Sequence, residues 1–223
     1  MMYLYGASGH GRVIKDIVES QGDVVDGFID DNLSLNSFVG LHVFHNIEGL
    51  SPVIVSIGAN GVRAKIVSRL NCVFGIAIHP SALISPSASI GEGSVVMPGV
   101  IINAGVKIGR HCIINTGASV DHECEIGDFT HIAPHATLCG NVIVGKGCLI
   151  GAGSSVIPCR HIGEWCVVGA GAAVVNDVVS KTTVVGVPAR ILNDDKMINK
   201  IRNCEEQDCV KTASNCVLGG DNQ

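Results

Sequence analysis

The chain has 223 residues, of which only 4% are aromatic and 16% charged while 28 are glycines, so its composition is far from that of an ordinary helical enzyme. Its formal net charge of -5 argues against nucleic acid or an acidic membrane surface as the main partner. The start of the chain has no basic stretch, and the apolar stretch 95–106 is short and interrupted, so the sequence predicts neither a signal peptide nor a membrane span. Ten cysteines without such a signal favour a reducing, cytoplasmic location.

The first 77 residues alternate strand and helix signals. A short apolar strand leads through a glycine turn into a helix, which carries Val13, Ile14, Ile17 and Val18 on one face. Residues 24–31 indicate a second strand, and residues 52–60 a third strand before a helix at 62–70. This alternation predicts a small parallel sheet, whose ligands bind at the carboxyl ends of the strands. The residues at those ends are Ser8, Gly9, His10, Asp30, Asp31 and Gly58.

The loop GASGHG, residues 6–11, suggests phosphate binding, because glycines let backbone amides approach a phosphate at a helix start. Its glycine spacing differs from GxGxxG, and a second mononucleotide-binding half is missing. The region therefore predicts a half-Rossmann module suited to a nucleoside diphosphate rather than to NAD. A packing domain with a glycine-rich turn is the alternative.

From residue 78 a six-residue repeat takes over. Each of seventeen consecutive hexads begins with Ile, Val or Leu: Ile78, Ile84, Ile90, Val96, Ile102, Ile108, Ile114, Val120, Ile126, Ile132, Leu138, Val144, Ile150, Val156, Ile162, Val168 and Val174. We call these residues the leaders. The fifth residue of each hexad is small or medium in size, except at Arg160. The second residue, directly after the leader, is often glycine, which we expect to supply backbone freedom at a tight corner. The repeat predicts a triangular β-solenoid, in which about eighteen residues close one coil and residues that far apart stack.

Several cysteines fall into this repeat. Cys112, Cys124, Cys148 and Cys166 occupy the fifth, interior position and are predicted to be compact apolar fillers. No CxxC motif occurs, so no zinc site is expected. Cys139 and Cys159 have no assigned role. Residues 180–192 leave the register through a Gly-x-Pro turn, and residues 194–223 suggest a helix start followed by a polar segment with Cys204, Cys209 and Cys216.

Three motifs together carry a family resemblance: YGASGHGRV with FIDD, then SVDHECEIGDFTHIAPHA in the hexads, then GVPAR. Over residues 3–192 the chain resembles the bacterial nucleotide-sugar acetyltransferases, typified by UDP-4-amino-sugar N-acetyltransferases of the bacillosamine pathway and sialic acid O-acetyltransferases. The resemblance implies a left-handed parallel β-helix (residues 78–179) after an α/β half-Rossmann module (1–77), with a turn and polar tail (180–223). It also implies acetyl-CoA as co-substrate and a homotrimer with the pantetheine in a groove between adjacent helices.

The resemblance assigns roles to residues of this sequence. His122 matches the catalytic base, and Glu123 matches the carboxylate that orients it. Cofactor contacts fall on His131, Gly140, Ala152 and Ala170, of which Gly140 offers its amide to the thioester carbonyl and the two alanines offer only backbone contacts. The nucleotide-sugar contacts fall on the strand-end residues of the N-terminal module, Ser8, Gly9, His10, Asp30, Asp31 and Gly58.

The hexad spacing supports the first pair of these roles independently. His122 and Glu123 are the third and fourth residues of their hexad, so both are expected at a corner and facing outward. Gly140 lies eighteen residues further on, directly beneath His122, so a base and a backbone donor come close, as acyl transfer requires. Taken with this spacing, the resemblance implies an acetyl-CoA-dependent N-acetyltransferase, without metal, acting on the 4-amino group of a UDP-linked 4-amino-4,6-dideoxy sugar. GDP and CMP are the alternative nucleotides.

Other functions compete with this one. O-acetylation of sialic acid or another sugar is the main alternative, because an imidazole activates an amine or a hydroxyl equally well. A zinc enzyme similar to the β-helical carbonic anhydrases is another hypothesis, suggested by His111, His131 and His135. The hexad positions argue against it: His111, His122 and His131 are fourth, third and sixth residues, which do not stack on one face. A non-catalytic β-helix scaffold predicts no release of CoA, and a nicotinamide oxidoreductase does not fit the size of the module.

Overall fold

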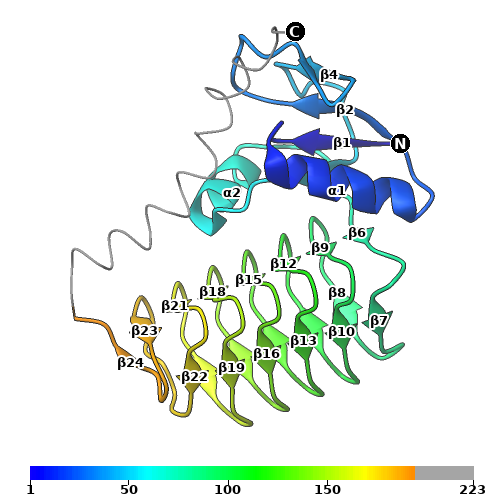
Figure 1. The fold of residues 1–223 in the computed structure, drawn as a ribbon. Helices are drawn as coiled ribbons and strands as arrows, with labels where there is room; N and C mark the ends of the chain where they lie inside the picture. Colours follow the sequence, from blue (N-terminus) through cyan, green and yellow to red (C-terminus); the bar gives the residue numbers. More distant parts are fainter. Residues whose placement is uncertain (194–223) are drawn as a thin grey trace, which may run out of the picture.

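The computed structural model describes residues 1–193, which form an α/β domain seated on a long parallel β-helix (Figure 1). The helix start and polar segment expected at 194–223, with Cys204, Cys209 and Cys216, lie outside the described residues. The order predicted from the sequence, an α/β module followed by hexapeptide coils, is confirmed. No helix among the residues that the structure describes is long and apolar enough to cross a membrane.

The N-terminal domain is a five-stranded sheet in the order β3-β4-β2-β1-β5. Its elements are β1 (Met2–Tyr5), α1 (Gly9–Ser20), β2 (Val25–Ile29), β3 (Ser37–Phe38), β4 (Leu41–Phe44), β5 (Val53–Val55) and α2 (Asn60–Val67). Strands β1, β2 and β5 are parallel, as predicted; β4 is also parallel to β2, and β3 pairs antiparallel with β4. The sequence did not predict β3 and β4, because a two-residue strand and a four-residue strand give almost no periodic signal.

Helix α1 buries one face against this sheet and against the β-helix. Ile14, Ile17 and Val18 are at most 1% exposed, and they share a core with Val95 and Ile113 of the β-helix. The prediction for Val13 was wrong, because this residue lies beside the buried stripe and is 42% exposed. The shared core fixes α1 on the β-helix, so the two parts of the chain hold one relative position.

The β-helix has three sheets, in each of which every third hexad strand pairs in parallel; sheet 1 also includes β23 and β24, which follow the hexads. Sheet 1, which faces the N-terminal domain, contains β6 (Ala77–Ile78), β9 (Val95–Val96), β12 (Ile113–Ile114), β15 (His131–Ile132), β18 (Leu149–Ile150), β21 (Val167–Val168), β23 (Thr183–Val185) and β24 (Arg190–Ile191). Sheet 2 contains β7 (Leu83–Ile84), β10 (Ile101–Ile102), β13 (Ser119–Val120), β16 (Thr137–Leu138), β19 (Ser155–Val156) and β22 (Ala173–Val174). Sheet 3 contains β8 (Ser89–Ile90), β11 (Lys107–Ile108), β14 (Glu125–Ile126), β17 (Ile143–Val144) and β20 (His161–Ile162).

Eighteen-residue stacking holds throughout the hexads, as Ile102 opposite Val120 illustrates. The leaders from Val96 to Val174 fill the interior and are at most 4% exposed. The four predicted filler cysteines, Cys112, Cys124, Cys148 and Cys166, are fully buried in the same core. After Val174 the register changes, since Val178 bridges to Ile162 and Thr183 of β23 pairs with Val167 of β21, and β24 runs antiparallel. The departure from the hexads therefore comes before residue 178, earlier than the predicted range 180–192 with its Gly-x-Pro turn.

The glycine that follows the leader does not supply the backbone freedom that the sequence led us to expect. The positive φ values fall on the fourth hexad residue, for example 59° at Glu123 and 71° at Gly105, and not on the glycine directly after the leader. That glycine instead lets two coils approach closely: a Cβ on Gly127 would lie 2.5 Å from the amide nitrogen of Lys146. The glycine after the leader is therefore required for space between coils rather than for backbone freedom.

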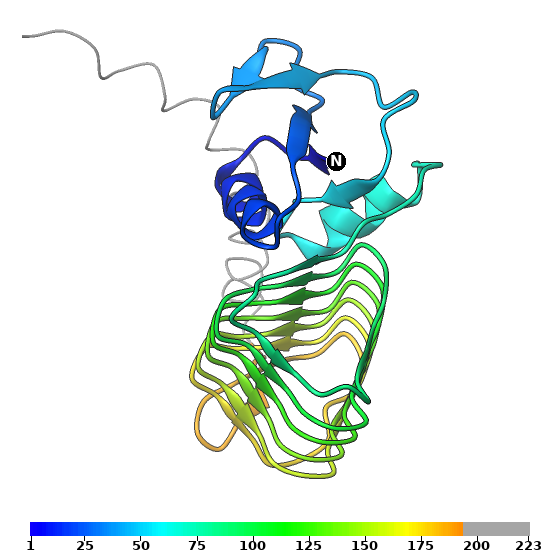
Figure 2. The same cartoon turned by 90° about the vertical axis from the view of Figure 1, so that its right-hand side faces the viewer.

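The β-helix is triangular in cross-section (Figure 2). We name its edges by the sheets that they join: corner 1–2, corner 2–3 and corner 3–1. The N-terminal domain covers sheet 1, so corner 2–3 is the edge opposite that domain.

Candidate active site

His122 and Gly140 lie one above the other in corner 2–3, as the stacking rule predicts. A Cβ added to Gly140 would meet the Nε2 atom of His122 at 2.5 Å, so the imidazole occupies the space that a side chain at residue 140 would take. The amide of Asn141 donates to the His122 carbonyl at 2.9 Å, which joins the two coils at this point. The base and the backbone donor of the expected acyl-transfer site are therefore neighbours within one chain.

Two carboxylates flank His122. The Oε2 atom of Glu123 lies 3.7 Å from His122 Nδ1, a distance that suits an ion pair but exceeds a hydrogen bond. Asp121 accepts the His122 amide at 2.8 Å and the side-chain amide of Asn103, also at 2.8 Å. The first of these bonds, with help from the second, lowers the pKa of Asp121. Both side chains of the predicted pair are exposed, at 58% for His122 and 67% for Glu123, so the imidazole faces outward from the single chain.

His131 lies on the opposite side of the β-helix, on sheet 1 at the junction with the N-terminal domain. Its Nε2 atom is 3.0 Å from the side-chain nitrogen of Asn115. Burial, then the charges of Arg63 and His10, lower the pKa of His131 to about 3. His10 lies across the junction near enough for this interaction, and burial and Arg63 lower its pKa to about 4. With pKa values this low, both histidines are neutral at pH 7.

Asn115 is a residue that our sequence reasoning missed. It occupies the corner just after β12, which pairs directly with the strand of His131. The stacking rule places residue 113 opposite residue 131, so a polar residue two positions later was a usable signal.

Asp30 and Asp31 follow β2 at the edge where β1 and β5 also end. Asp30 accepts the amides of Ala7 and Asn32, both at 2.9 Å, and so holds the start of the glycine loop. Asp31 accepts the hydroxyl of Tyr5 at 2.5 Å and the guanidinium of Arg69 at 2.7 Å. Both aspartates therefore lie where predicted, with their carboxylates already engaged by the chain itself.

These contacts shift the ionisation of the cluster. Burial, followed by the hydrogen bond to Asp31, raises the pKa of Tyr5 to about 12. Partial burial alone would raise the pKa of Asp31, but the hydrogen bonds from Tyr5 and Arg69 outweigh it and lower that pKa. At neutral pH the edge therefore carries an ionised Asp31 beside a cationic Arg69, and the phenol stays protonated.

The remaining predicted residues of this edge surround open space. Ser8 precedes α1, and its hydroxyl makes no capping hydrogen bond to the helix. A Cβ added to Gly9 or to Gly58 would meet nothing within 4 Å. Open space thus lies beside the backbone at Gly9, where α1 begins, and at Gly58, just before α2.

The predicted site residues consequently form two groups within one chain. The first group, His122, Glu123 and Gly140, lies on corner 2–3. The second group, with His131, His10 and the strand ends, lies on or above sheet 1, and Ala152 and Ala170 occupy corner 1–2 beside it. A triangular cross-section places corner 2–3 and sheet 1 on opposite sides (Figure 2), so one chain does not bring the two groups together.

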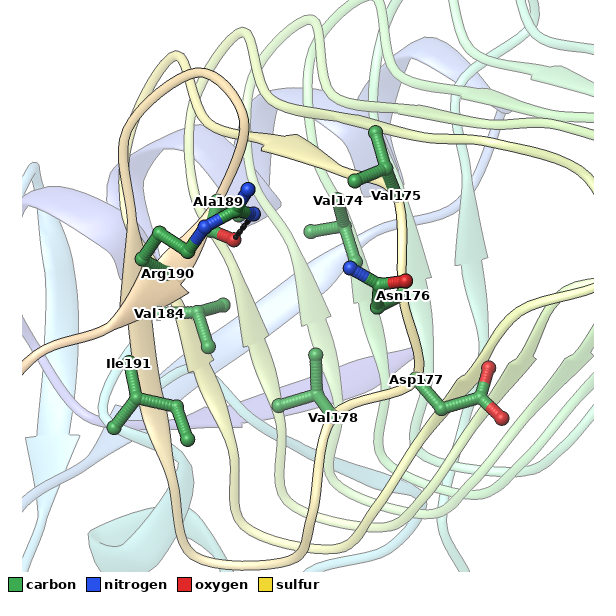
Figure 3. Close-up of a pocket in the computed structure, with 9 residues that line it drawn as sticks. All are labelled: Val174, Val175, Asn176, Asp177, Val178, Val184, Ala189, Arg190 and Ile191. Atoms are coloured by element: carbon green, nitrogen blue, oxygen red, sulfur yellow. Dashed lines mark hydrogen bonds between the residues drawn. The ribbon is translucent and has the colours of Figure 1, made fainter.

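The metal alternative and a pocket at the far end of the β-helix can be compared with this arrangement. Among residues 1–193, no group of three or more His, Cys, Asp or Glu side chains lies so as to hold a metal ion. His111 is instead 1% exposed, stacked on Phe129 and edge-on to Phe74. A small pocket of about 230 Å³ lies at the end of the β-helix (Figure 3), where Ala189 and Arg190 of the GVPAR motif line it with seven other residues, and none of the predicted site residues is among them.

Known protein families match both the N-terminal domain and the β-helix of this chain. Residues 2–70 match the PglD N-terminal domain, and residues 87–122, 105–140 and 123–158 match the bacterial transferase hexapeptide. A GDP-perosamine N-acetyltransferase of Escherichia coli O157:H7 is 30% identical over 59% of this chain and 66% of its own length. A UDP-N-acetylbacillosamine N-acetyltransferase of Bacillus subtilis (strain 168) is 39% identical over 42% of this chain and 50% of its own length. These matches therefore span between half and two thirds of the curated relatives.

A solved structure matches over almost its whole length. A variant of perosamine N-acetyltransferase from Caulobacter crescentus, in complex with CoA and GDP-perosamine, is 37% identical, with a TM-score of 0.82 over 86% of this chain and 97% of that chain. The fold and these matches thus define a hexapeptide-repeat acyltransferase with an α/β N-terminal domain. Within that class, the chain belongs to the family of nucleotide-sugar N-acetyltransferases that carry a PglD-type N-terminal domain.

Proposed function

We propose that this protein transfers an acetyl group from acetyl-CoA to the 4-amino group of a UDP-linked 4-amino-4,6-dideoxy sugar. The observation that carries the proposal is the stack of His122 on Gly140, because it sets a base beside a backbone donor. In the proposed reaction the His122 imidazole removes a proton from the amine as its nitrogen attacks the thioester carbonyl. The Gly140 amide stabilises the tetrahedral oxyanion, an effect worth about 3 kcal/mol. The C–S bond then breaks, and the departing CoA thiolate takes the proton from the imidazolium.

The roles of the two parts of the chain follow from where their residues lie. In the proposal, residues 1–77 bind the nucleotide sugar at the open space beside Ser8, Gly9 and Gly58, and residues 78–179 carry out acyl transfer. Asp30 holds the loop, and Asp31 with Arg69 forms the charged rim of the nucleotide site. In the proposal, His10 contacts the nucleotide sugar and His131 contacts acetyl-CoA.

A homotrimer resolves the separation of the two groups. Because His122 lies on the side opposite sheet 1, a second copy must supply corner 2–3 to the nucleotide bound by the first. A groove between two copies also explains why the proposed acetyl-CoA contacts are spread over two edges, Gly140 on corner 2–3 and Ala152 and Ala170 on corner 1–2. The proposed location is the cytoplasm, which is supported by the seven free cysteines of the described residues.

A GDP-linked sugar is the second candidate substrate. It is favoured by the Escherichia coli and Caulobacter crescentus relatives, whose names or bound ligand specify GDP-perosamine. A panel of UDP-4-amino sugars, GDP-perosamine, and free and CMP-linked sialic acid distinguishes these possibilities. CoA release is followed with a thiol reagent added after quenching, because the protein's own cysteines would react.

Each outcome of the panel has a defined meaning. Turnover with a UDP-linked amino sugar supports the first proposal. Turnover with GDP-perosamine alone means that the substrate carries GDP instead of UDP. Turnover with sialic acid alone makes the enzyme an O-acetyltransferase. No CoA release with any acceptor, from protein shown to be folded and trimeric, contradicts the proposed N-acetyl transfer.

A further inference from the structure

Arg63 stands out as a fully buried cation at the junction of the two domains. Only 1% of it is exposed, and the structure gives its guanidinium five hydrogen bonds. Its Nε donates to the His111 carbonyl at 2.9 Å and one terminal nitrogen donates to the Phe129 carbonyl at 2.8 Å. The other terminal nitrogen donates to the carbonyls of Ile57 and Gly58, at 2.8 and 2.9 Å. One side chain therefore binds both the loop after β5 and the β-helix.

The carbonyls that Arg63 uses belong to one column of corner 3–1. His111 and Phe129 are fourth residues of hexads one coil apart, and both have the positive φ of that position. The amide of Phe129 donates to the carbonyl of Arg110, the third hexad residue of the coil before. Stacking of the coils therefore uses the third-position carbonyl. The fourth-position carbonyl, such as that of His111, is left for a donor from outside the β-helix. Corner geometry thus explains why an arginine from another domain can bind here.

Asn60 extends the same contact to the next coil. Its side-chain nitrogen donates to the carbonyls of Gly147 and Cys148, at 3.3 and 2.9 Å, and its oxygen accepts from Arg63 at 2.7 Å. Residues 111, 129 and 147 are spaced by one coil each. The start of α2 is therefore held against three successive coils, and the loop that contains Gly58 is held with it.

We propose that Arg63 is a positioning residue that fixes the nucleotide-binding loop at Gly58 on the β-helix. This inference rests on the proposed function in taking Gly58 as part of the nucleotide site. A planar guanidinium with five donors in fixed directions can serve both domains at once, whereas an ammonium group cannot. Its charge has a second effect, since Arg63 lowers the pKa of both His10 and His131 in addition to their burial.

Two substitutions separate the geometry from the charge. Arg63→Lys keeps the charge but loses the fork, and Arg63→Met loses both. We expect both variants to bind UDP and GDP at least about tenfold more weakly in calorimetry, the loss expected when hydrogen bonds to a charged group no longer hold the loop, while acetyl-CoA binding changes less than about twofold. Arg110→Lys is the matched control, because Arg110 is a half-exposed arginine that pairs with Glu92 on the same corner.

The charge is tested by histidine titration, followed by NMR. Arg63→Met should raise the pKa of His10 and of His131, and Arg63→Lys should leave both low, a difference that a purely structural role would not produce. Hydrogen exchange at residues 56–60 should accelerate in Arg63→Lys and remain unchanged in Arg110→Lys, whether or not a nucleotide binds. If wild-type protein binds neither nucleotide, the proposed function fails while exchange and titration still test Arg63. Unchanged exchange in Arg63→Lys, or equal histidine pKa values in the two Arg63 variants, would overturn the inference.

Discussion

Substitution of Gly140 by alanine tests the geometry of the proposed base without removing any functional group. The new methyl group would lie 2.5 Å from His122 Nε2 and 2.6 Å from its Cε1. Ordinary carbon contacts are about 3.5–4 Å, so the imidazole must move by about 1 Å. The fold can accept the change, because the φ of Gly140 is not positive and the obstructing atoms belong to an exposed side chain.

A displacement of about 1 Å in a catalytic group lowers the rate by about a hundredfold, or about 2.7 kcal/mol in the activation barrier. We therefore expect the kcat of Gly140→Ala to fall by about that factor, while its Tm and its binding of the nucleotide sugar stay as in the wild type. Gly61→Ala is the matched control, since a Cβ at Gly61 meets nothing within 4 Å and the residue lies in α2. The kcat values of the wild type, Gly140→Ala and Gly61→Ala are measured from the steady-state rate of CoA release. A Gly140→Ala enzyme with near-normal kcat would refute the argument that the imidazole works from this position.

Three further predictions concern the other groups. Asp31→Ala should weaken binding of the nucleotide sugar, because it leaves Arg69 without its ion pair at the rim, and should leave acetyl-CoA binding intact; equal loss of both in calorimetry contradicts the two-site layout. Glu123→Gln should lower kcat less than His122→Ala does, because 3.7 Å separates Glu123 from the imidazole, and pH–rate profiles of both variants provide the comparison. Burial, then the charges of Arg110 and Arg63, lower the pKa of His111 from 6.5 to about 4. The free energy of unfolding should therefore be highest above pH 6.5, where His111 is neutral in both the folded and the unfolded chain. It should fall by up to about 3 kcal/mol as the pH drops to 4, because the unfolded chain then binds the proton more tightly. His111→Phe keeps the stack on Phe129 and should flatten that fall in urea titrations at pH 7.5, 5.5 and 4.5; an unchanged pH dependence assigns it to other groups.

The β-helix could be predicted almost residue by residue, because each hexad makes the same contacts as its neighbours. A leader such as Val120 faces the interior in every coil, and the eighteen-residue offset that pairs it with Leu138 also places Gly140 beneath His122. Stacking is a local rule, so the sequence alone carries it. The role of glycine was predicted less well, since composition does not distinguish a need for space from a need for positive φ.

The junction between the domains could not be predicted in this way. Arg63 gives no signal in the sequence, because a helical arginine is ordinarily exposed and only the column of corner carbonyls makes its burial favourable. The separation of His122 from the strand-end residues of the N-terminal domain likewise depends on which sheet receives that domain. The hairpin of β3 and β4 was missed because its strands are too short to show a period.

The central claim is that His122 of one copy acts on the nucleotide sugar bound by another copy, and mixed trimers test it most directly. His122→Ala and Asp31→Ala chains with different tags are coexpressed, purified through both tags and assayed for CoA release at a low nucleotide-sugar concentration. His122→Ala alone should lose at least about a hundredfold in turnover, as expected for removal of a general base. Each trimer purified through both tags contains both variants, so one of its three sites combines an intact His122 with an intact Asp31 from its neighbour, and activity should rise toward about a third of the wild-type level. Near-normal turnover of His122→Ala alone, or mixed trimers no more active than the better of the two variants, would contradict the account.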